Sequence, residues 1–269
     1  MNNNFNYITE ENLSIGWSKA FLRVMEAKEI SPLVVSITGF EGNEPIEISE
    51  IRDSVNSTLI ENNTKLTIDR VANTIFPASL WNKNIPRQKL YERYLRVFGR
   101  IKKDSHNHYG LYFQRLIAYQ PKESTHKPVN QLDQIIELWS ERMEVNKNPR
   151  RSALQAAVYD PTRDLTKQPV RGFPCLQQVA FAPCGRDGLI VTGFYAMQYI
   201  FERAYGNYLG LCRLGEFIAT QLGLKLVQMN CISNIAVLGK TKIGALRPLE
   251  KQLSDMLTAN LVTNGVVRF

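Results

Sequence analysis

The chain has 269 residues, of which 44% are apolar and 22% charged, a balance that is ordinary for a globular protein and excludes a disordered or fibrous one. It contains no apolar run of about 18 residues and its first residues are polar, so we expect neither a transmembrane helix nor a signal peptide, and predict a cytoplasmic protein. The net charge of +8 favours anionic ligands such as nucleotides or nucleic acid, and it is also typical of a solvated basic surface.

The first half of the chain predicts mainly helices. Apolar side chains at spacings of three and four indicate a helix over 8–28, and the apolar run 33–37 predicts a strand that ends at glycine-rich turns. Further segments of helical or mixed character follow at 46–62, 66–80, 86–103 and 129–146. The helix over 86–103 is amphipathic and carries the densest group of basic side chains in the chain.

The second half predicts short strands around one long helix. The expected strands are 152–159, 176–181, 189–194, 224–229 and 232–238, and the expected helices are 208–222 and 247–258. Gly185 and Gly188 predict a hairpin between the second and third strands, and Gly223 predicts the end of the long helix. Helices followed by strands indicate an α+β or layered α/β protein, which we expect to form a single domain over 1–269.

Four cysteines lie in this second half: Cys175, Cys184, Cys212 and Cys231. Their spacing matches no zinc-binding pattern, so we expect no metal. In a cytoplasmic chain of this size they are predicted to be free thiols, mostly buried, with structural roles for Cys184, Cys212 and Cys231.

Several short segments carry a resemblance when they are taken together and in order. They are Tyr109-Gly110 with Gln114-Arg115, Asn130 to Ile135, Asn148-Pro149-Arg150-Arg151, Ala157 to Pro161, Phe173-Pro174-Cys175, and Gly206-Asn207 placed 16 residues before Gly223. This order resembles the thymidylate synthase and pyrimidine hydroxymethylase family over about 109–237. The resemblance implies a thymidylate synthase fold of α/β (α+β) class, with a large mixed, mostly antiparallel sheet, helices on one face, and a homodimer formed through the other face.

The family joins a one-carbon unit to C5 of a pyrimidine nucleotide. By resemblance, Cys175 is the nucleophile that adds to C6, because a thiolate beside guanidinium groups can make C5 reactive. Arg150 and Arg151 resemble the pair that binds the nucleotide phosphate from the partner subunit, and Asn207 resembles the side chain that reads the pyrimidine edge. Tyr109 would line the pocket. Methylenetetrahydrofolate is the implied one-carbon donor, and a pyrimidine nucleotide or nucleoside is the implied ligand.

Other positions depart from the family pattern. Leu176 stands where the family has a histidine, Ala196 and Met197 where it has an arginine and a serine for phosphate, and Tyr199 where it has the folate-binding aspartate. The position of its early glutamate falls on Asn73. These losses remove phosphate, folate and acid/base groups, so a conventional dTMP-forming enzyme is not expected.

Three functions stay open. The first is a divergent enzyme that modifies C5 of a different pyrimidine, the second is a non-catalytic nucleotide-binding or scaffold protein, and the third is a nucleic-acid-binding protein that uses its basic surface. Ordinary structural roles also remain open for the singled-out residues. The alternative for Cys175 is a place in the core, and for the Arg150-Arg151 pair it is an exposed loop. Asn207 is alternatively a helix cap, a role that is compatible with base reading, while His106 and His108 are expected in an exposed loop.

Overall fold

A mixed sheet of six strands forms the centre of the computed structural model, which describes residues 6–103, 111–121, 125–165, 167 and 174–263. The strand order is β1-β3-β10-β8-β7-β6. The bounds are β1 Tyr7–Glu10, β3 Leu33–Ile37, β10 Lys225–Ser233, β8 Gly188–Tyr195, β7 Leu176–Cys184 and β6 Gln155–Ala157. Three of the five pairings are antiparallel, and β1 with β3 and β10 with β8 are parallel. The predicted mixed α/β class is therefore confirmed.

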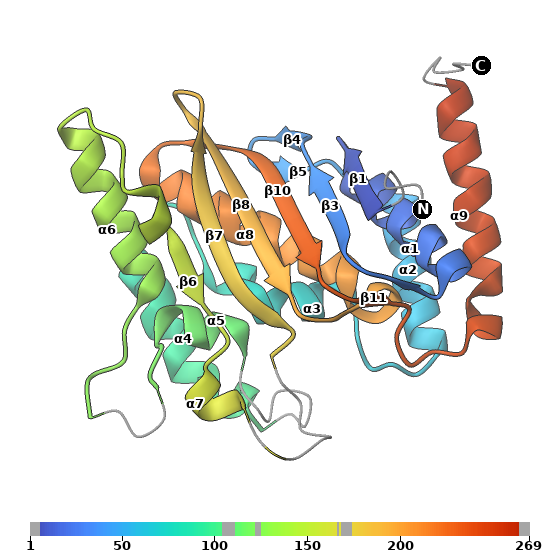
Figure 1. Cartoon of the computed structure of the whole chain (residues 1–269), viewed down its shortest axis with the longest axis horizontal. Coiled ribbons are helices and arrows are strands. Elements are labelled where there is room, and N and C mark those ends of the chain that lie inside the picture. The colour runs from blue at the N-terminus through green and yellow to red at the C-terminus, as the bar shows by residue number, and fades with distance from the viewer. Residues whose placement is uncertain (1–5, 104–110, 122–124, 166, 168–173, 264–269) are drawn as a thin grey trace.

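Helices pack behind this sheet (Figure 1). The longest of those against it is α8, which runs beneath the centre of the sheet, and α3 and α1 lie beside it. The helices are α1 Leu13–Ala27, α2 Ser49–Glu61, α3 Ile68–Ile75, α4 Arg87–Ile101, α5 Tyr112–Ile117, α6 Gln131–Glu144, α7 Pro161–Asp164, α8 Tyr205–Leu222 and α9 Ile243–Thr263. Two smaller sheets, β2-β11-β9 and β4-β5, are formed by Glu29–Ile30, Ala236–Val237, Gln198–Tyr199, Phe40–Glu41 and Glu44–Pro45.

The two faces of the central sheet differ in burial. Side chains that face α8, such as Val179, Val191 and Met229, are fully buried. Their neighbours on the opposite face are only partly buried or exposed, and they include the small or polar Ala180 and Thr192 as well as the apolar Ile190 and Phe194. No helix that the structure describes covers this second face, which is the front face in Figure 1. The period-two alternation of each strand thus leaves one broad, open sheet surface.

Close packing of α8 on the sheet depends on glycine. A side chain at Gly193 of β8 would place its Cβ 2.7 Å from Cδ1 of Leu211 in α8, and one at Gly215 would lie 2.8 Å from Leu226 in β10. Since these contacts are shorter than van der Waals distance, glycine is needed for the helix to approach the strands this closely.

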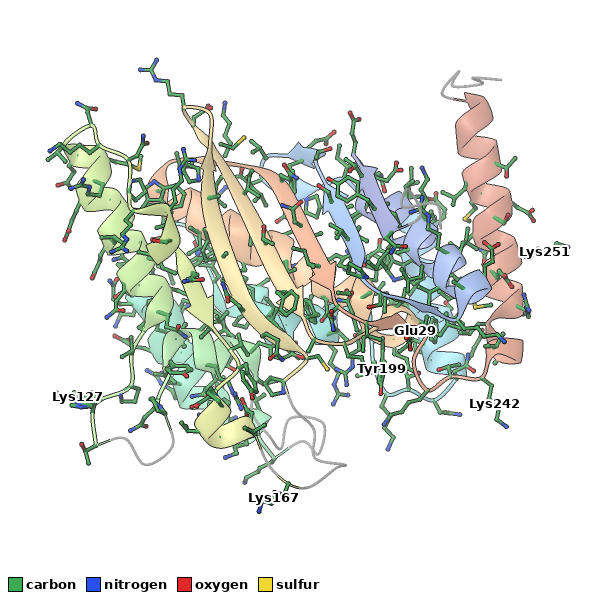
Figure 2. The ribbon with its side chains drawn as sticks, viewed as in Figure 1. Glu29, Lys127, Lys167, Tyr199, Lys242 and Lys251 are labelled. Carbon is green, nitrogen blue, oxygen red and sulfur yellow. The ribbon has the colours of Figure 1, made fainter. Side chains whose placement is uncertain are left out.

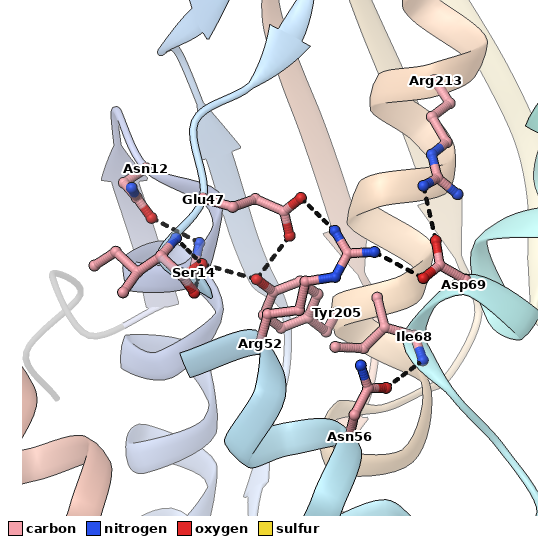
Figure 3. A network of polar contacts seen from close by, with 10 residues as sticks. Asn12, Ser14, Glu47, Arg52, Asn56, Ile68, Asp69, Tyr205 and Arg213 are labelled. Atoms are coloured by element: carbon pink, nitrogen blue, oxygen red, sulfur yellow. Dashed lines mark hydrogen bonds and ion pairs between the residues drawn. The ribbon is translucent and has the colours of Figure 1, made fainter. Parts of the chain in front are cut away.

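A chain of partly buried polar contacts joins three of the helices (Figure 3). Arg52 of α2 donates hydrogen bonds to Glu47 at 2.7 Å and to Asp69 of α3 at 2.8 Å, and Arg213 of α8 donates to the other Asp69 oxygen at 2.8 Å. Tyr205 donates to Glu47 at 2.8 Å. We call Glu47, Arg52, Asp69, Tyr205 and Arg213 the polar network. It connects α2, α3 and α8 through groups that satisfy one another.

Most predicted elements are present with shifted ends. The helices predicted over 86–103, 129–146 and 208–222 correspond to α4, α6 and α8, and the strand over 33–37 is β3. Gly223 ends α8 with a φ of 65°, as its position predicted. The hairpin between β7 and β8 is also confirmed, with Gly185 at a φ of 60° in its turn.

Several boundaries were wrong. The helix predicted over 8–28 begins only at Leu13, where the Asn12 side chain accepts the amides of Ser14 and Ile15, and β1 occupies the residues before it. The run 232–238 is not a separate strand, because β10 continues to Ser233 and only Ala236–Val237 forms β11.

Two other elements differ from their predicted lengths. The strand predicted over 152–159 is shortened to Gln155–Ala157 by a 3₁₀ turn at Arg151–Ala153. The last helix is longer than 247–258, since α9 spans Ile243–Thr263.

Candidate functional site

Cys175 lies directly before β7, which begins at Leu176. Its side chain is exposed, and its carbonyl accepts a hydrogen bond of 2.9 Å from the amide of Ala196. This bond ties the start of β7 to the residue that follows β8. The thiol is therefore held at an end of the sheet where two strands and the following turn converge, and the prediction that it could be a core residue is wrong.

The Cys175 thiol interacts electrostatically with Arg203 and Tyr112. Burial of the site raises the pKa of Cys175, and the Arg203 guanidinium acts in the opposite direction. Tyr112 of α5 lies in the same group: burial and then Cys175 raise the pKa of Tyr112, while Arg203 lowers it. Cys175, Tyr112 and Arg203 therefore form one electrostatically coupled cluster. In the absence of a ligand, desolvation outweighs the single guanidinium and the thiol form is favoured.

The floor beneath this cluster is closed. Tyr195 and Tyr208 are fully buried, and neither hydroxyl has a hydrogen-bond partner among the described residues. Burial raises the pKa of both hydroxyls well above the ordinary value. Beside them, Gln198 accepts a hydrogen bond of 2.7 Å from Ser233. The Cys175 side chain thus sits above a dry interior and faces outward.

A cavity of about 470 Å³ has Arg203 of this cluster in its wall. It is lined by Asn62, Asn63, Thr64, Leu66, Tyr199, Glu202, Arg203, Lys240, Thr241, Lys242 and Ala245. Figure 2 shows Tyr199 and Lys242 at the lower edge of the molecule. Arg203 lines the cavity and is also the charged side chain that acts on the pKa of Cys175, so it is the residue that the cavity and the cluster share.

The chain around the cavity has an unusual backbone. Residues Ile200–Ala204 form a π-helical turn that leads directly into α8. Such turns are rare and occur often at functional sites, because the wide turn redirects side chains that a regular helix would stack. Here it carries Glu202 and Arg203 to the cavity wall.

Glu202 holds the part of the cavity wall that is formed by Lys240 and Thr241. Its carboxylate is buried and accepts hydrogen bonds of 2.8 Å from the amides of Lys240 and Thr241, and one of 2.9 Å from the Thr241 hydroxyl. Gly239 has a φ of 127°, and a Cβ there would lie 2.4 Å from a Glu202 oxygen. This clamp, which we define as Glu202 with 239–241, holds the two lysines at the cavity rim.

Arg150 and Arg151 lie far from Cys175 within one chain. Both are exposed, and Arg150 donates a hydrogen bond of 3.1 Å to Ser152. They precede β6, which pairs antiparallel with β7 so that Gln155 lies opposite Ala180. The arginines are therefore near the far end of β7 while Cys175 is at its start, a separation on the order of 25 Å at about 3.3 Å per residue.

Asn207 does not cap a helix. It is the third residue of α8, which continues from the π-helical turn, and its side chain is buried. Its predicted role as a helix cap is therefore wrong, and its predicted role as a base-reading group stays a prediction. Tyr109, His106, His108 and Phe173 lie outside the described residues.

The positions that depart from the family pattern fall in this region. Leu176 is fully buried, whereas Ala196 and Met197 are exposed and Tyr199 lines the cavity. Asn73 lines a second cavity of about 260 Å³ between α3 and α4. Positions 196 and 197 carry no charged side chain in place of the family's arginine and serine. Arg203 follows them in the chain, within the π-helical turn Ile200–Ala204.

The other cysteines differ from the prediction in one case. Cys212 and Cys231 are buried, and burial raises the pKa of Cys231 to about 12 and that of Cys212 well above its ordinary value. Both are inert core thiols, as expected. Cys184 is exposed at the β7–β8 hairpin, so its predicted burial is wrong. The described part of the chain contains no disulfide, in agreement with the predicted free thiols.

Sequence reasoning missed Arg203, Lys240 and Lys242 of the cavity wall, and Tyr112 of the cluster with Cys175. These residues belong to no motif and come from three separate parts of the chain. The excess of basic side chains was the one available signal, and it did not indicate a place.

Comparisons with known proteins give no family for this chain. Neither the scan against protein-family models nor the search of curated proteins finds a match. Among the residues that the structure describes, no group of three or more His, Cys, Asp or Glu side chains could hold a metal ion. No described helix combines the length and apolar character needed to span a membrane.

Proposed function

We propose that the chain is a divergent thymidylate synthase-like enzyme that transfers a one-carbon unit to C5 of a pyrimidine nucleotide or related compound. The observation that carries this proposal is the exposed Cys175 thiol, held at the end of the sheet beside Arg203 and Tyr112 and next to a cavity. A nucleophilic thiol needs access to its substrate and a positive neighbour that favours the thiolate, and Cys175 has both.

The proposed reaction begins when the Cys175 thiolate adds to C6 of the pyrimidine. The electron pair of the C5–C6 double bond then makes C5 nucleophilic, and C5 attacks the one-carbon donor. Loss of the C5 proton and cleavage of the bond between the one-carbon unit and the donor nitrogen then leave an exocyclic methylene group and release tetrahydrofolate. Addition of water to this methylene, with departure of the thiolate from C6, restores the ring and gives the hydroxymethyl product. For a methyl product, a hydride from the tetrahydrofolate, which becomes dihydrofolate, takes the place of water. Methylenetetrahydrofolate is the proposed donor, and Asn207 is the proposed reader of the pyrimidine edge.

We also propose the thymidylate synthase fold and a homodimer through the open sheet face. The uncovered front face supports this, because Ala180 and Thr192 lie opposite each other there next to the partly buried or exposed Ile190 and Phe194, and a broad, partly apolar sheet surface suits a twofold interface. The separation of Arg150 and Arg151 from Cys175 supports it as well. In a dimer, the arginine pair of one chain would serve the thiol of the other.

Sedimentation analysis tests the dimer. Ala180→Arg places a charge at the centre of the open face and should give a monomer, because a buried unpaired charge destabilises an interface. Lys251→Glu on the exposed side of α9 is the matched control and should leave the dimer intact. A wild-type monomer, or a dimer that survives Ala180→Arg, would overturn this part of the proposal.

Release of tritium from C5-labelled pyrimidine nucleotides tests the reaction. Cys175→Ser should abolish release, whereas Cys184→Ser, which removes the other exposed thiol, should not. Equal release by wild type and Cys175→Ser would exclude the nucleophile.

A second function is favoured by the electrostatics of the thiol. Desolvation raises the pKa of Cys175, and Leu176 is an apolar side chain where the family has a histidine. Both features suit a nucleotide-binding protein that no longer performs the reaction. Thermal stabilisation by pyrimidine nucleotides without tritium release would identify this function, since a ligand at 100 times its dissociation constant adds about 2.7 kcal/mol of stability.

A further inference from the structure

Three cations line the cavity without a counterion among the described residues. Arg203, Lys240 and Lys242 line it, and none of them forms an ion pair with any residue that the structure describes. The one acidic side chain in the lining is Glu202. Its carboxylate already accepts three hydrogen bonds from Lys240 and Thr241, so it is occupied in holding the loop.

The cavity is therefore a concave site with a net positive charge. Like charges placed close together repel one another, so such a cluster is stabilised when an anion binds between them. In the neutral lining, the Asn62 amide and the Thr64 hydroxyl already donate hydrogen bonds to the Thr58 and Leu59 carbonyls, so the attraction for an anion comes from the cations. Its volume of about 470 Å³ lies within the range of roughly 300–1,000 Å³ that is typical of small-molecule sites.

We propose that Arg203, Lys240 and Lys242 bind a phosphate group of the ligand whose other end reaches Cys175. A phosphate monoester carries close to two negative charges and several acceptor oxygens, which match one guanidinium and two ammonium groups. Arg203 acts on both the cavity and the thiol, so it is the group that would lie between the phosphate and the reacting ring.

This inference deepens the proposed function and rests on it only for the pyrimidine. The phosphate side chains of the family are replaced here by Ala196 and Met197, which offer no charge. The cavity cations supply that charge from a different stretch of chain. The anion site can be tested without a pyrimidine, so the two proposals can fail separately.

The test uses calorimetry of the full chain with inorganic phosphate, pyrophosphate, dUMP and deoxyuridine. The variant is Lys240→Ala/Lys242→Ala, and the matched control is Lys127→Ala/Lys251→Ala, whose lysines lie elsewhere on the surface (Figure 2). The cavity variant keeps its loop, because Glu202 binds backbone amides of 240 and 241 that alanine retains.

We expect wild type and the control to bind pyrophosphate and to prefer dUMP to deoxyuridine. The cavity variant should lose about tenfold or more in affinity for the phosphate-bearing ligands and little for deoxyuridine. Equal phosphate binding by the two double variants, or no phosphate binding by wild type, would overturn the anion site.

The remaining outcomes show which anionic group the cavity binds and whether a pyrimidine is part of the ligand. If phosphate binding depends on the cavity lysines, but deoxyuridine does not bind and dUMP binds no more tightly than inorganic phosphate, the anion site is supported and the pyrimidine proposal is overturned. Cavity-dependent binding of an oligoglutamate chain in place of phosphate shows that the anion is a carboxylate, and overturns the phosphate assignment.

Discussion

The polar network and the cavity contain similar cationic side chains, but those of the network are paired with carboxylates and those of the cavity form no ion pair with a described residue. In the network, Arg52 and Arg213 share Asp69, and every partner lies within hydrogen-bonding distance (Figure 3). At the cavity, Arg203 and two lysines face one carboxylate that is bound to backbone amides. Paired cations hold helices together, whereas unpaired cations around a hollow are groups available to a ligand. The same residue types therefore stabilise the fold in one region and are proposed to bind an anion in the other.

Glu202→Ala is expected to have the largest effect. It removes the acceptor for two amides and one hydroxyl of the loop at 240–241, so the free energy of unfolding should fall by about 2–3 kcal/mol. Urea unfolding measures this loss. Glu202→Gln keeps an acceptor oxygen and should lose less. If both substitutions left stability unchanged, the clamp would not hold the cavity wall.

Asp69→Ala should have the next largest effect, and on stability alone. It leaves Arg52 and Arg213 without their shared partner, but Asp69 is half exposed, so we expect a loss of about 1–2 kcal/mol. Phosphate binding should be unchanged. A loss of phosphate affinity as large as that of the cavity variant would contradict the separation of the two regions.

The pH dependence of the network has a defined sign. Burial alone would raise the pKa of Asp69, but hydrogen bonds from Arg213 and Arg52 bring it below its ordinary value. A lowered pKa means stability that is present above the unfolded value of 3.8 and is lost as the pH falls through the lower folded value. Asp69→Ala should therefore become indistinguishable from wild type in strong acid, as acid titration of the unfolding free energy would test.

A pair of carboxylates next to the network should respond in the opposite direction. Burial first, and then the neighbouring Glu44, raises the pKa of Glu216 to about 7. Stability is then greatest below the ordinary value of 4.5 and is lost as the pH rises through about 7. Glu216→Gln keeps the site neutral, so above about pH 7 it should be more stable than wild type by about 1 kcal/mol after screening. Equal stability of the two proteins at alkaline pH would contradict the raised pKa of Glu216.

The contrast between the two regions also explains what the sequence could predict. Helices such as α4 and α6 were predictable because their apolar side chains recur at the helical period within a single segment. The end of α8 was predictable from Gly223, and the hairpin from Gly185. β1 was missed because its four residues are too few for a pattern and are followed directly by an Asn12 cap.

The cavity could not be predicted in this way. Its lining comes from 62–66, 199–203 and 240–245, and no local rule relates these segments. The π-helical turn that places Arg203 at the cavity wall is not indicated by any pattern of apolar residues in the sequence. Cys175 was predicted as a candidate by its motif, but its neighbours Tyr112 and Arg203 became visible only through the fold.

Arg203→Ala is expected to have the smallest effect, and it tests the link between cavity and thiol. Desolvation raises the pKa of Cys175 and Arg203 opposes this, so the substitution should raise the pKa further and slow alkylation by iodoacetamide at neutral pH severalfold. A Cys184→Ser background removes the other exposed thiol, and Arg203→Lys keeps the charge as a control. A phosphate bound at the cavity would partly neutralise Arg203. Phosphate should therefore slow alkylation of the background protein but not of its Arg203→Ala derivative, and equal slowing in both would disconnect the cavity from Cys175.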